Sequence, residues 1–162
     1  MAKVLFINPS VREEDDPRHV PYGIALLASI IMEKGHSVQV FDQNAWRVSD
    51  NTLKQVLRAD SWDVIALGGI TTAYGSLKHI IKTARSVSPK SKIVLGGGVL
   101  TSIPREMMFW LYEVDIGVIG EAFIIKSDNS ILPLEKQTIE LKTSAGVNIA
   151  IITVAKTKKK IK

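Results

Sequence analysis

The stretches DVIALGGITT, residues 63–72, and KIVLGGG, residues 92–98, decide the fold of this 162-residue chain. In each, a short apolar run ends abruptly at two or three glycines. An apolar run without polar alternation is typical of a strand that is buried on both faces, as in a parallel sheet covered by helices. The glycines end the strand and let another group approach the backbone closely. We therefore expect parallel strands at Asp63–Leu67 and Lys92–Leu95, with open loops after them.

The same pattern continues on both sides of these stretches. Further apolar runs predict strands at Val4–Asn8, Ser37–Asp42 and Asp115–Ile119. Helical spacing predicts four helices between the strands, namely Tyr22–Lys34, a helix capped by Asp50 with Leu53, Val56 and Leu57 on one face, Tyr74–Val87, and Pro104–Leu111. Five strands alternating with four helices predict an α/β fold, a doubly wound parallel sheet with right-handed crossovers. The common order for five such strands is 2-1-3-4-5, the flavodoxin-like, Rossmann-like topology.

This rhythm ends at Phe123, which divides the chain into a domain at 1–123 and a basic segment at 124–162. Lys and Arg balance Asp and Glu in the first part, thirteen against thirteen, so the net charge of +5 lies in the second. The basic segment predicts a hairpin of Thr138–Lys142 and Val147–Val154, followed by a disordered lysine tail from Lys156. No aromatic residue is interleaved with these lysines for base stacking, so we expect no nucleic-acid partner.

Composition excludes several classes of function. The chain has no Cys, which excludes disulfides, a thiolate zinc site, a cysteine nucleophile and a cysteine-ligated iron–sulfur cluster. No apolar run approaches the roughly 20 residues of a membrane span, and no signal peptide is visible, so we expect a cytoplasmic protein without a membrane partner. A dinucleotide G-x-G-x-x-G fingerprint and a P-loop are both absent. His19, His36 and His79 share no motif, so no metal ligand is predicted, and we expect His36 and His79 to face solvent.

Ligands of an open parallel sheet bind beyond the carboxyl ends of its strands. The sequence places Asn8-Pro9-Ser10, Asp42-Gln43-Asn44, Gly68-Gly69-Ile70-Thr71-Thr72, Gly96-Gly97-Gly98 and Gly120-Glu121 at that edge. Thr71 and Thr72 offer hydroxyls there, while the glycines are either turn residues or positions of close ligand approach. Because we expect the loop Gly96–Gly98 to lie outside the core, a side chain at Gly97 should block a ligand and leave the fold intact.

Several groups of residues give the chain a family resemblance. They are Val4-Leu5-Phe6-Ile7-Asn8-Pro9, Val20-Pro21-Tyr22-Gly23-Ile24-Ala25-Leu26-Leu27-Ala28, Lys34-Gly35-His36-Ser37-Val38, the two glycine-ended strands, and Asp115-Ile116-Gly117-Val118-Ile119-Gly120-Glu121. In this order, over about residues 2–123, they resemble the N-terminal cobalamin-binding domain of cobalamin-dependent radical SAM enzymes. That group includes the anaerobic magnesium-protoporphyrin IX monomethyl ester oxidative cyclase and many methyltransferases. The D-x-H-x-x-G motif, whose His ligates cobalt in cobalamin mutases, is absent here, as is usual in the radical SAM group.

The resemblance implies a cobalamin laid across the carboxyl edge of the sheet, with its nucleotide tail entering between strands. Thr71 and Thr72 would bond the tail, and the loop Gly96–Gly98 would give it room. The implied cofactor-binding residues are Asn8, Pro9, Ser10, Tyr22 and Gly23 on the corrin side, Gly69, Thr71, Thr72, Gly96, Gly97 and Gly98 toward the tail, and Gly120 and Glu121 in the last loop. Where the family usually reads G-E-G-E, this chain reads Gly120-Glu121-Ala122-Phe123.

The radical SAM part of that family carries a C-x-x-x-C-x-x-C motif, which a chain without Cys cannot supply. The resemblance therefore implies a binding module that is not catalytic alone, either a fragment or a stand-alone domain. The iron–sulfur cluster and S-adenosylmethionine would belong to a full-length parent, with a radical SAM domain or subunit as the partner of this module. Two alternatives stay open, a flavodoxin-like domain for another nucleotide-like ligand and a non-binding structural fragment.

Overall fold

A computed structural model describes residues 1–11, 20–120, 123–126, 131–133, 139–142 and 148–152. Its sheet begins with five parallel strands: β1 (Lys3–Asn8), β2 (Ser37–Asp42), β3 (Val64–Gly68), β4 (Lys92–Gly96) and β5 (Ile116–Ile119). They lie side by side in the order β2-β1-β3-β4-β5, which confirms the predicted doubly wound topology.

The sheet continues beyond β5 with two antiparallel strands, β6 (Phe123–Lys126) and β7 (Ile131–Pro133). Two more strands, β8 (Ile139–Lys142) and β9 (Asn148–Ile152), pair antiparallel as a separate sheet. The sequence showed no clear period at 124–134, so β6 and β7 were not expected. The predicted lysine tail lies outside the described residues, and the domain boundary at Phe123 stays a prediction.

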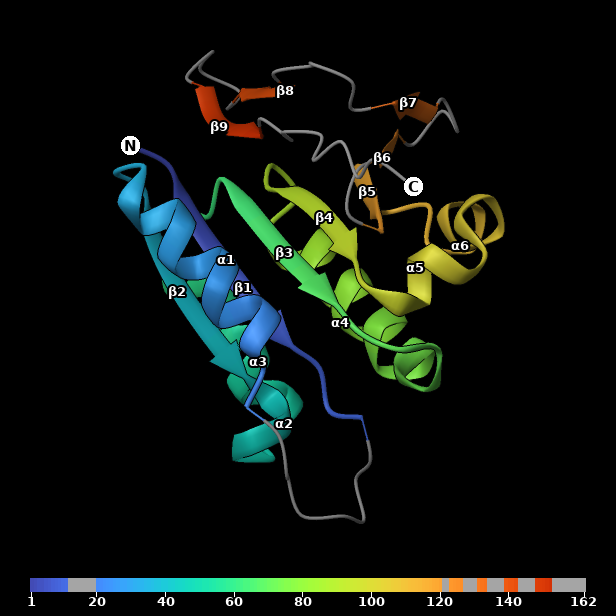
Figure 1. Ribbon diagram of the computed structural model, residues 1–162. Helices are drawn as coiled ribbons and strands as arrows, with labels where there is room; N and C mark the ends of the chain where they lie inside the picture. Colours follow the sequence, from blue (N-terminus) through green and yellow to red (C-terminus); the bar gives the residue numbers. More distant parts are fainter. Residues whose placement is uncertain (12–19, 121–122, 127–130, 134–138, 143–147, 153–162) are drawn as a thin grey trace.

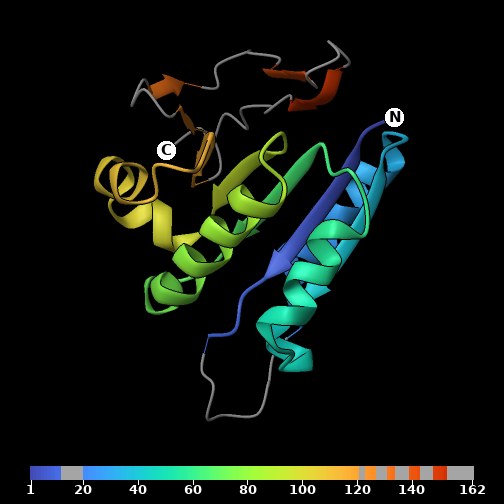
Figure 2. The same ribbon diagram turned by 180° about the vertical axis from the view of Figure 1, so that it is seen from behind.

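The helices lie on both faces of the sheet (Figures 1 and 2). They are α1 (Tyr22–Glu33), α2 (Gln43–Trp46), α3 (Asp50–Arg58), the 3-10 helix η1 (Thr71–Ala73), α4 (Tyr74–Val87), α5 (Gly98–Ser102) and α6 (Pro104–Trp110). The cap of α3 is Ser49 instead of the expected Asp50, which forms the first helical turn. Among the described residues, no helix combines the length and apolarity that a bilayer crossing requires.

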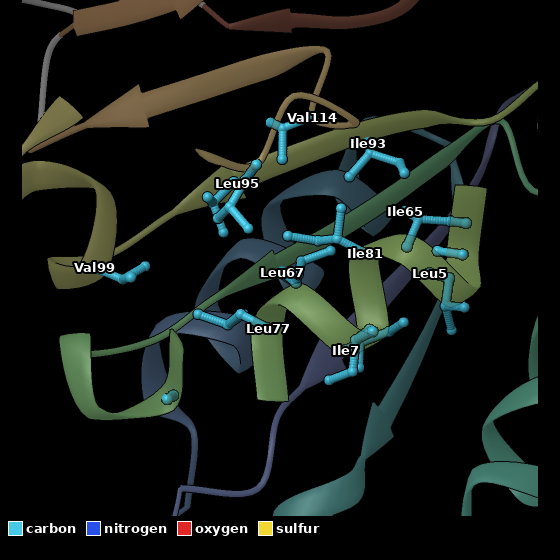
Figure 3. Close-up of a cluster of buried hydrophobic side chains, with 14 of the residues drawn as sticks. Leu5, Ile7, Ile65, Leu67, Leu77, Ile81, Ile93, Leu95, Val99 and Val114 are labelled. Atoms are coloured by element: carbon cyan, nitrogen blue, oxygen red, sulfur yellow. The ribbon is translucent and has the colours of Figure 1, made fainter. Parts of the chain in front are cut away.

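The larger core lies between the sheet and the helices α3, α4, α5 and α6 (Figure 3). Leu5, Ile65 and Ile93 are inaccessible to solvent and point from three neighbouring strands to this face. Leu77 and Ile81 of α4 pack against them, because they recur one turn apart on a single helix face. This core holds the strands rigidly and fixes where their carboxyl ends lie.

The opposite face has a smaller core, built by β1, β3 and α1. Val4 and Phe6 of β1 and Val64 and Ala66 of β3 are buried there, together with Ala28 of α1. Since paired residues of parallel strands point to the same face, the register Phe6↔Ala66 and Ala66↔Val94 places Val94 of β4 on this face too.

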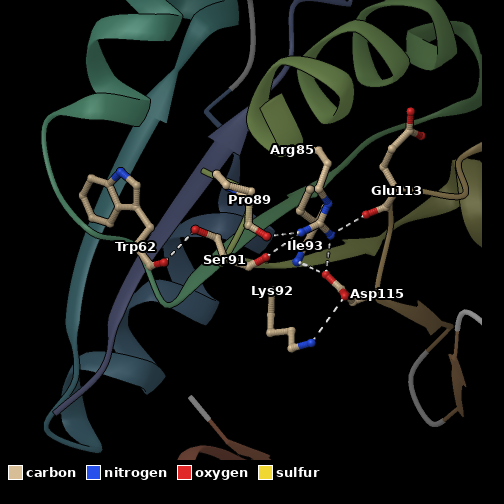
Figure 4. Close-up of polar contacts among 8 residues, drawn as sticks. All are labelled: Trp62, Arg85, Pro89, Ser91, Lys92, Ile93, Glu113 and Asp115. Carbon is tan, nitrogen blue, oxygen red and sulfur yellow. Dashed lines mark hydrogen bonds and ion pairs between the residues drawn. The ribbon is translucent and has the colours of Figure 1, made fainter. Parts of the chain in front are cut away.

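A polar network fixes the amino ends of β4 and β5 (Figure 4). The Arg85 guanidinium donates to Asp115 Oδ2 at 2.6 Å, to the Glu113 carbonyl at 2.7 Å and to the Ser91 carbonyl at 3.0 Å. Asp115 Oδ2 also accepts from the Ile93 backbone N–H at 2.8 Å. These bonds tie α4 to the loops that precede the two strands, at the edge opposite the predicted ligand site.

Candidate functional site

The carboxyl ends of β1, β3, β4 and β5 meet at one edge of the sheet, because these four strands run parallel. The loops that leave this edge contain most of the residues predicted to bind a ligand. Pro9 follows β1, Gly69 follows β3, Gly97 follows β4 and Gly120 follows β5. The structure therefore brings together four segments that lie far apart in the sequence.

Two pairs of glycines bring the loops after β3 and β4 into backbone contact. A Cβ at Gly68 would lie 2.9 Å from the Gly96 carbonyl oxygen. Gly97 has a φ of +83°, and a Cβ there would lie 2.9 Å from the carbonyl oxygen of Gly69 and 3.0 Å from its nitrogen. That carbonyl also accepts a 2.8 Å hydrogen bond from the Val99 N–H.

This geometry corrects the expectation that a side chain at Gly97 would leave the fold intact. The left-handed backbone and the 2.9 Å approach both require glycine at this position. Gly97 is therefore a structural glycine that holds the β3 and β4 loops together, whatever else it contacts.

Gly96 differs from its neighbour, because a Cβ there would meet only Val118, at 3.7 Å. Gly96 pairs with Gly68 in the parallel register, two residues beyond the pair Ala66 and Val94, so both pairs belong to the same face of the sheet. Ala66, Gly68 and Gly96 therefore give the α1 face a floor of small residues where β3 and β4 end. We call these three residues the small-residue floor.

Hydroxyl groups lie beside the glycine loops. Thr71 and Thr72 form η1 directly after Ile70, and their side chains are exposed at the carboxyl edge. The Thr101 hydroxyl of α5 donates to the Gly97 carbonyl at 3.0 Å and accepts from the Gly120 N–H at 3.0 Å. Thr101 thus links the loops after β4 and β5, a role that no sequence motif indicated.

The predicted residues after β1 are held mainly by the neighbouring strand and helix. Asn8 donates from Nδ2 to Asp42 Oδ1 at 2.8 Å, and the Ser10 hydroxyl accepts from Arg47 Nη1 at 2.7 Å. Pro9 is buried against the loop after β3.

At the start of α1, the Tyr22 side chain is 79% exposed and Gly23 has open space around its α-carbon. Among the described residues, none covers this end of the edge at Tyr22 and Gly23. Glu121, also predicted to contact the ligand, lies outside the described residues.

The two described histidines lie away from the glycine loops. His36 is half-buried, which corrects the expectation that it faces solvent, because its Nδ1 accepts the Ala2 N–H at 3.2 Å near the amino end of β1. His79 Nε2 lies 2.8 Å from Asp50 Oδ2, and about half of each side chain is exposed.

Asp50 and His79 line a pocket of about 340 Å³ together with Ser10 and Gln43, of which Ser10 is also a predicted cofactor-binding residue. His19 lies outside the described residues. Within the part of the chain that is described, no three His, Asp or Glu side chains are grouped to hold a metal ion.

Asp60 lies next to Lys3, at the opposite edge of the sheet. Lys3 donates to Asp60 at 2.6 Å, and this hydrogen bond, with a second from the Ser61 N–H, holds the pKa of the Asp60 carboxyl below its ordinary value.

The carboxyl edge of the sheet offers backbone groups, hydroxyls and small residues. Such a surface suits a large ligand that is bound by shape and hydrogen bonds.

A doubly wound sheet with glycine loops at its carboxyl edge defines a ligand-binding α/β domain. Residues 11–124 match the family model of the B12 binding domain, and the chain belongs to that family. It is also 26% identical over 101 residues to an uncharacterized methyltransferase of Pyrococcus horikoshii. The aligned region covers 62% of this chain and 22% of that relative, so the chain spans about a fifth of the relative's length.

Proposed function

We propose that the carboxyl edge of this sheet binds cobalamin, with the corrin ring over the loops and the nucleotide tail along the small-residue floor. The observation that carries the proposal is the pairing of Gly68 with Gly96 beside Ala66, which leaves the floor free of large side chains. Family membership supports the identity of the ligand. A flat heterocycle needs such a floor, because any larger side chain would occupy its volume.

The residues around the floor fit the other parts of the cofactor. The exposed hydroxyls of Thr71 and Thr72 are placed to hydrogen-bond the polar groups of the tail. Exposed Gly98 and Gly120 let a bulky ring approach the backbone of the last two loops. Bound cobalamin would supply a cobalt centre for methyl-group or radical chemistry, while the protein positions it.

We further infer that the module serves a radical SAM type enzyme, a methyltransferase or an oxidative cyclase. The order of the N-terminal motifs supports this assignment, and so does the name of the Pyrococcus horikoshii relative, an uncharacterized methyltransferase. The iron–sulfur cluster and S-adenosylmethionine would come from a partner domain or subunit, because this chain has no Cys.

The test is a visible spectrum after mixing with hydroxocobalamin and desalting. Cobalamin should elute with the protein, and the corrin bands should shift relative to those of the free cofactor. Flavin mononucleotide, carried through the same procedure, is the control for a general nucleotide site. Loss of all cobalamin on desalting, without a measurable affinity in a titration, would refute the proposal.

A further inference from the structure

Helix α1 is apolar on almost all of its sides. Between Tyr22 and Met32 it has no charged residue, and only Ala28 is fully buried. Leu26 is 62% exposed and Leu27 is 50% exposed. A helix that is hydrophobic all round is normally enclosed on all sides, so this helix indicates a second covering surface.

The sheet face beneath α1 is covered only in part. Figure 1 shows α1 in front of β1 and β2, whereas no described helix lies in front of β4 and β5. Val94 of β4 pairs with Ile116 of β5, so both side chains point to this face, and Val118 lies two residues further along β5. These three side chains are partly exposed. We call them the uncovered half of the face, and parallel sheets normally have both faces covered.

We propose that a second copy of this chain covers the face, forming a two-fold dimer with its axis parallel to the strands. Such a rotation turns the two α1-bearing faces toward each other. It also places the half covered by α1 in one chain opposite the uncovered half of the other chain. Each α1 then lies between two sheets, on β1 and β2 of its own chain and on β4 and β5 of its partner. This contact is isologous and closes on itself.

The charge and shape of the surface suit a second copy of this chain. The surface contributed by α1 lacks charge until Glu33, so two copies meet without like-charge repulsion. An exposed apolar helix and an uncovered apolar half-face occur together on one chain, and the rotation matches the one to the other.

The size of the surface points the same way. A helix of 12 residues is about 18 Å long, and alone it falls well short of the roughly 800 Å² per partner of a stable interface. Only an arrangement that uses helix and sheet together approaches that area.

Sedimentation velocity without added cobalamin tests the proposal over about 1 µM to 1 mM protein, a range that reaches weak association. The natural chain should pass from monomer to dimer. Leu26→Glu, and independently Ile30→Lys, should raise the dissociation constant at least about tenfold while the circular dichroism spectrum stays native.

Phe109→Glu is the matched control, because Phe109 is 73% exposed but lies on α6. This variant should dimerise like the natural chain. A natural chain that stays monomeric throughout the range would overturn the proposal, as would a Leu26→Glu variant that dimerises unchanged.

Cross-linking tests the geometry itself, since the chain has no Cys of its own. A mixture of Leu26→Cys and Val94→Cys proteins, one carrying a tag that changes its size, should form the mixed disulfide dimer under mild oxidation. If Leu26→Cys alone cross-links more than the mixture does, helix packs on helix and the proposed arrangement is wrong.

Discussion

Replacement of Gly96 by valine separates the ligand role of the glycine loops from their structural role. A Cβ at Gly96 would meet Val118 at 3.7 Å, which is an ordinary van der Waals contact. Valine there would place its methyl groups over the floor formed with Ala66 and Gly68. We therefore expect Gly96→Val to fold normally and to lose affinity for cobalamin.

The magnitudes follow from the same contacts. Replacing a strand glycine without strain stabilises a protein by about 0.4–1 kcal/mol, through the entropy of the unfolded chain. Overpacking a close-fitting site costs roughly 1–3 kcal/mol, so the dissociation constant for cobalamin should rise about tenfold to hundredfold. Gly97→Ala is the contrasting variant. Its backbone, with a φ of +83° and a ψ of −174°, lies in a region that is essentially restricted to glycine, so alanine there costs about 1–3 kcal/mol, and the 2.9 Å approach to Gly69 adds to this.

The assay pairs a guanidinium unfolding curve with a spectroscopic titration by hydroxocobalamin. Gly96→Val should keep or raise the unfolding midpoint and weaken binding, whereas Gly97→Ala should lower the midpoint. A Gly96→Val protein that binds cobalamin as tightly as the natural chain would show that the tail lies elsewhere. A Gly96→Val protein that is strongly destabilised would show that the floor is not open.

Three further outcomes are expected. Arg85→Met should lower the free energy of unfolding by roughly 1–3 kcal/mol, because it removes the 2.6 Å partner of partly buried Asp115 and the donor to the Ser91 and Glu113 carbonyls. Exposed Lys92→Met removes only a 3.5 Å contact with Asp115 and should change it by under about 1 kcal/mol in the same denaturation assay. The pKa of Asp60 is lowered in the folded protein, so its contact with Lys3 stabilises the fold at pH values above the unfolded pKa. This stabilisation is lost as the pH falls through the folded pKa. The variant Lys3→Met removes the amine, and NMR titration should show that the pKa of Asp60 rises. Finally, cobalamin should shift the dimer toward monomer in sedimentation, since tail and partner would cover the same face; unchanged dimer at saturating cobalamin would contradict that overlap.

The sequence predicts this fold well where the local signals agree with the tertiary contacts. The strand Ser37–Asp42 and the helix Tyr74–Val87 begin and end where the pattern places them. The strand follows Gly35, whose φ of +81° suits the turn that ends α1. The helix has one apolar face that packs on the sheet. In both places propensity, periodicity and burial favour the same element.

The site is less predictable, because its key contacts join distant backbones. Gly69 and Gly97 are 28 positions apart, and nothing in either loop alone indicates that a Cβ at one would collide with the other. Thr101 was missed for the same reason, since its two bonds depend on where β5 ends. Helix α5 was missed as well, because its five residues are too few for a periodic pattern.

Helix α1 was predicted from apolar positions that turn out to serve two different surfaces. Ile24 and Ile31 turn toward the sheet, while Leu26 and Ile30 are exposed. Complete burial of a leucine or isoleucine is worth about 1.5–3 kcal/mol, so covering the exposed halves on two copies contributes several kcal/mol. Association costs about 4–15 kcal/mol in lost freedom, which offsets most of that gain. The dimer should therefore be weak and concentration-dependent, and a cofactor that binds the same face tightly would displace it.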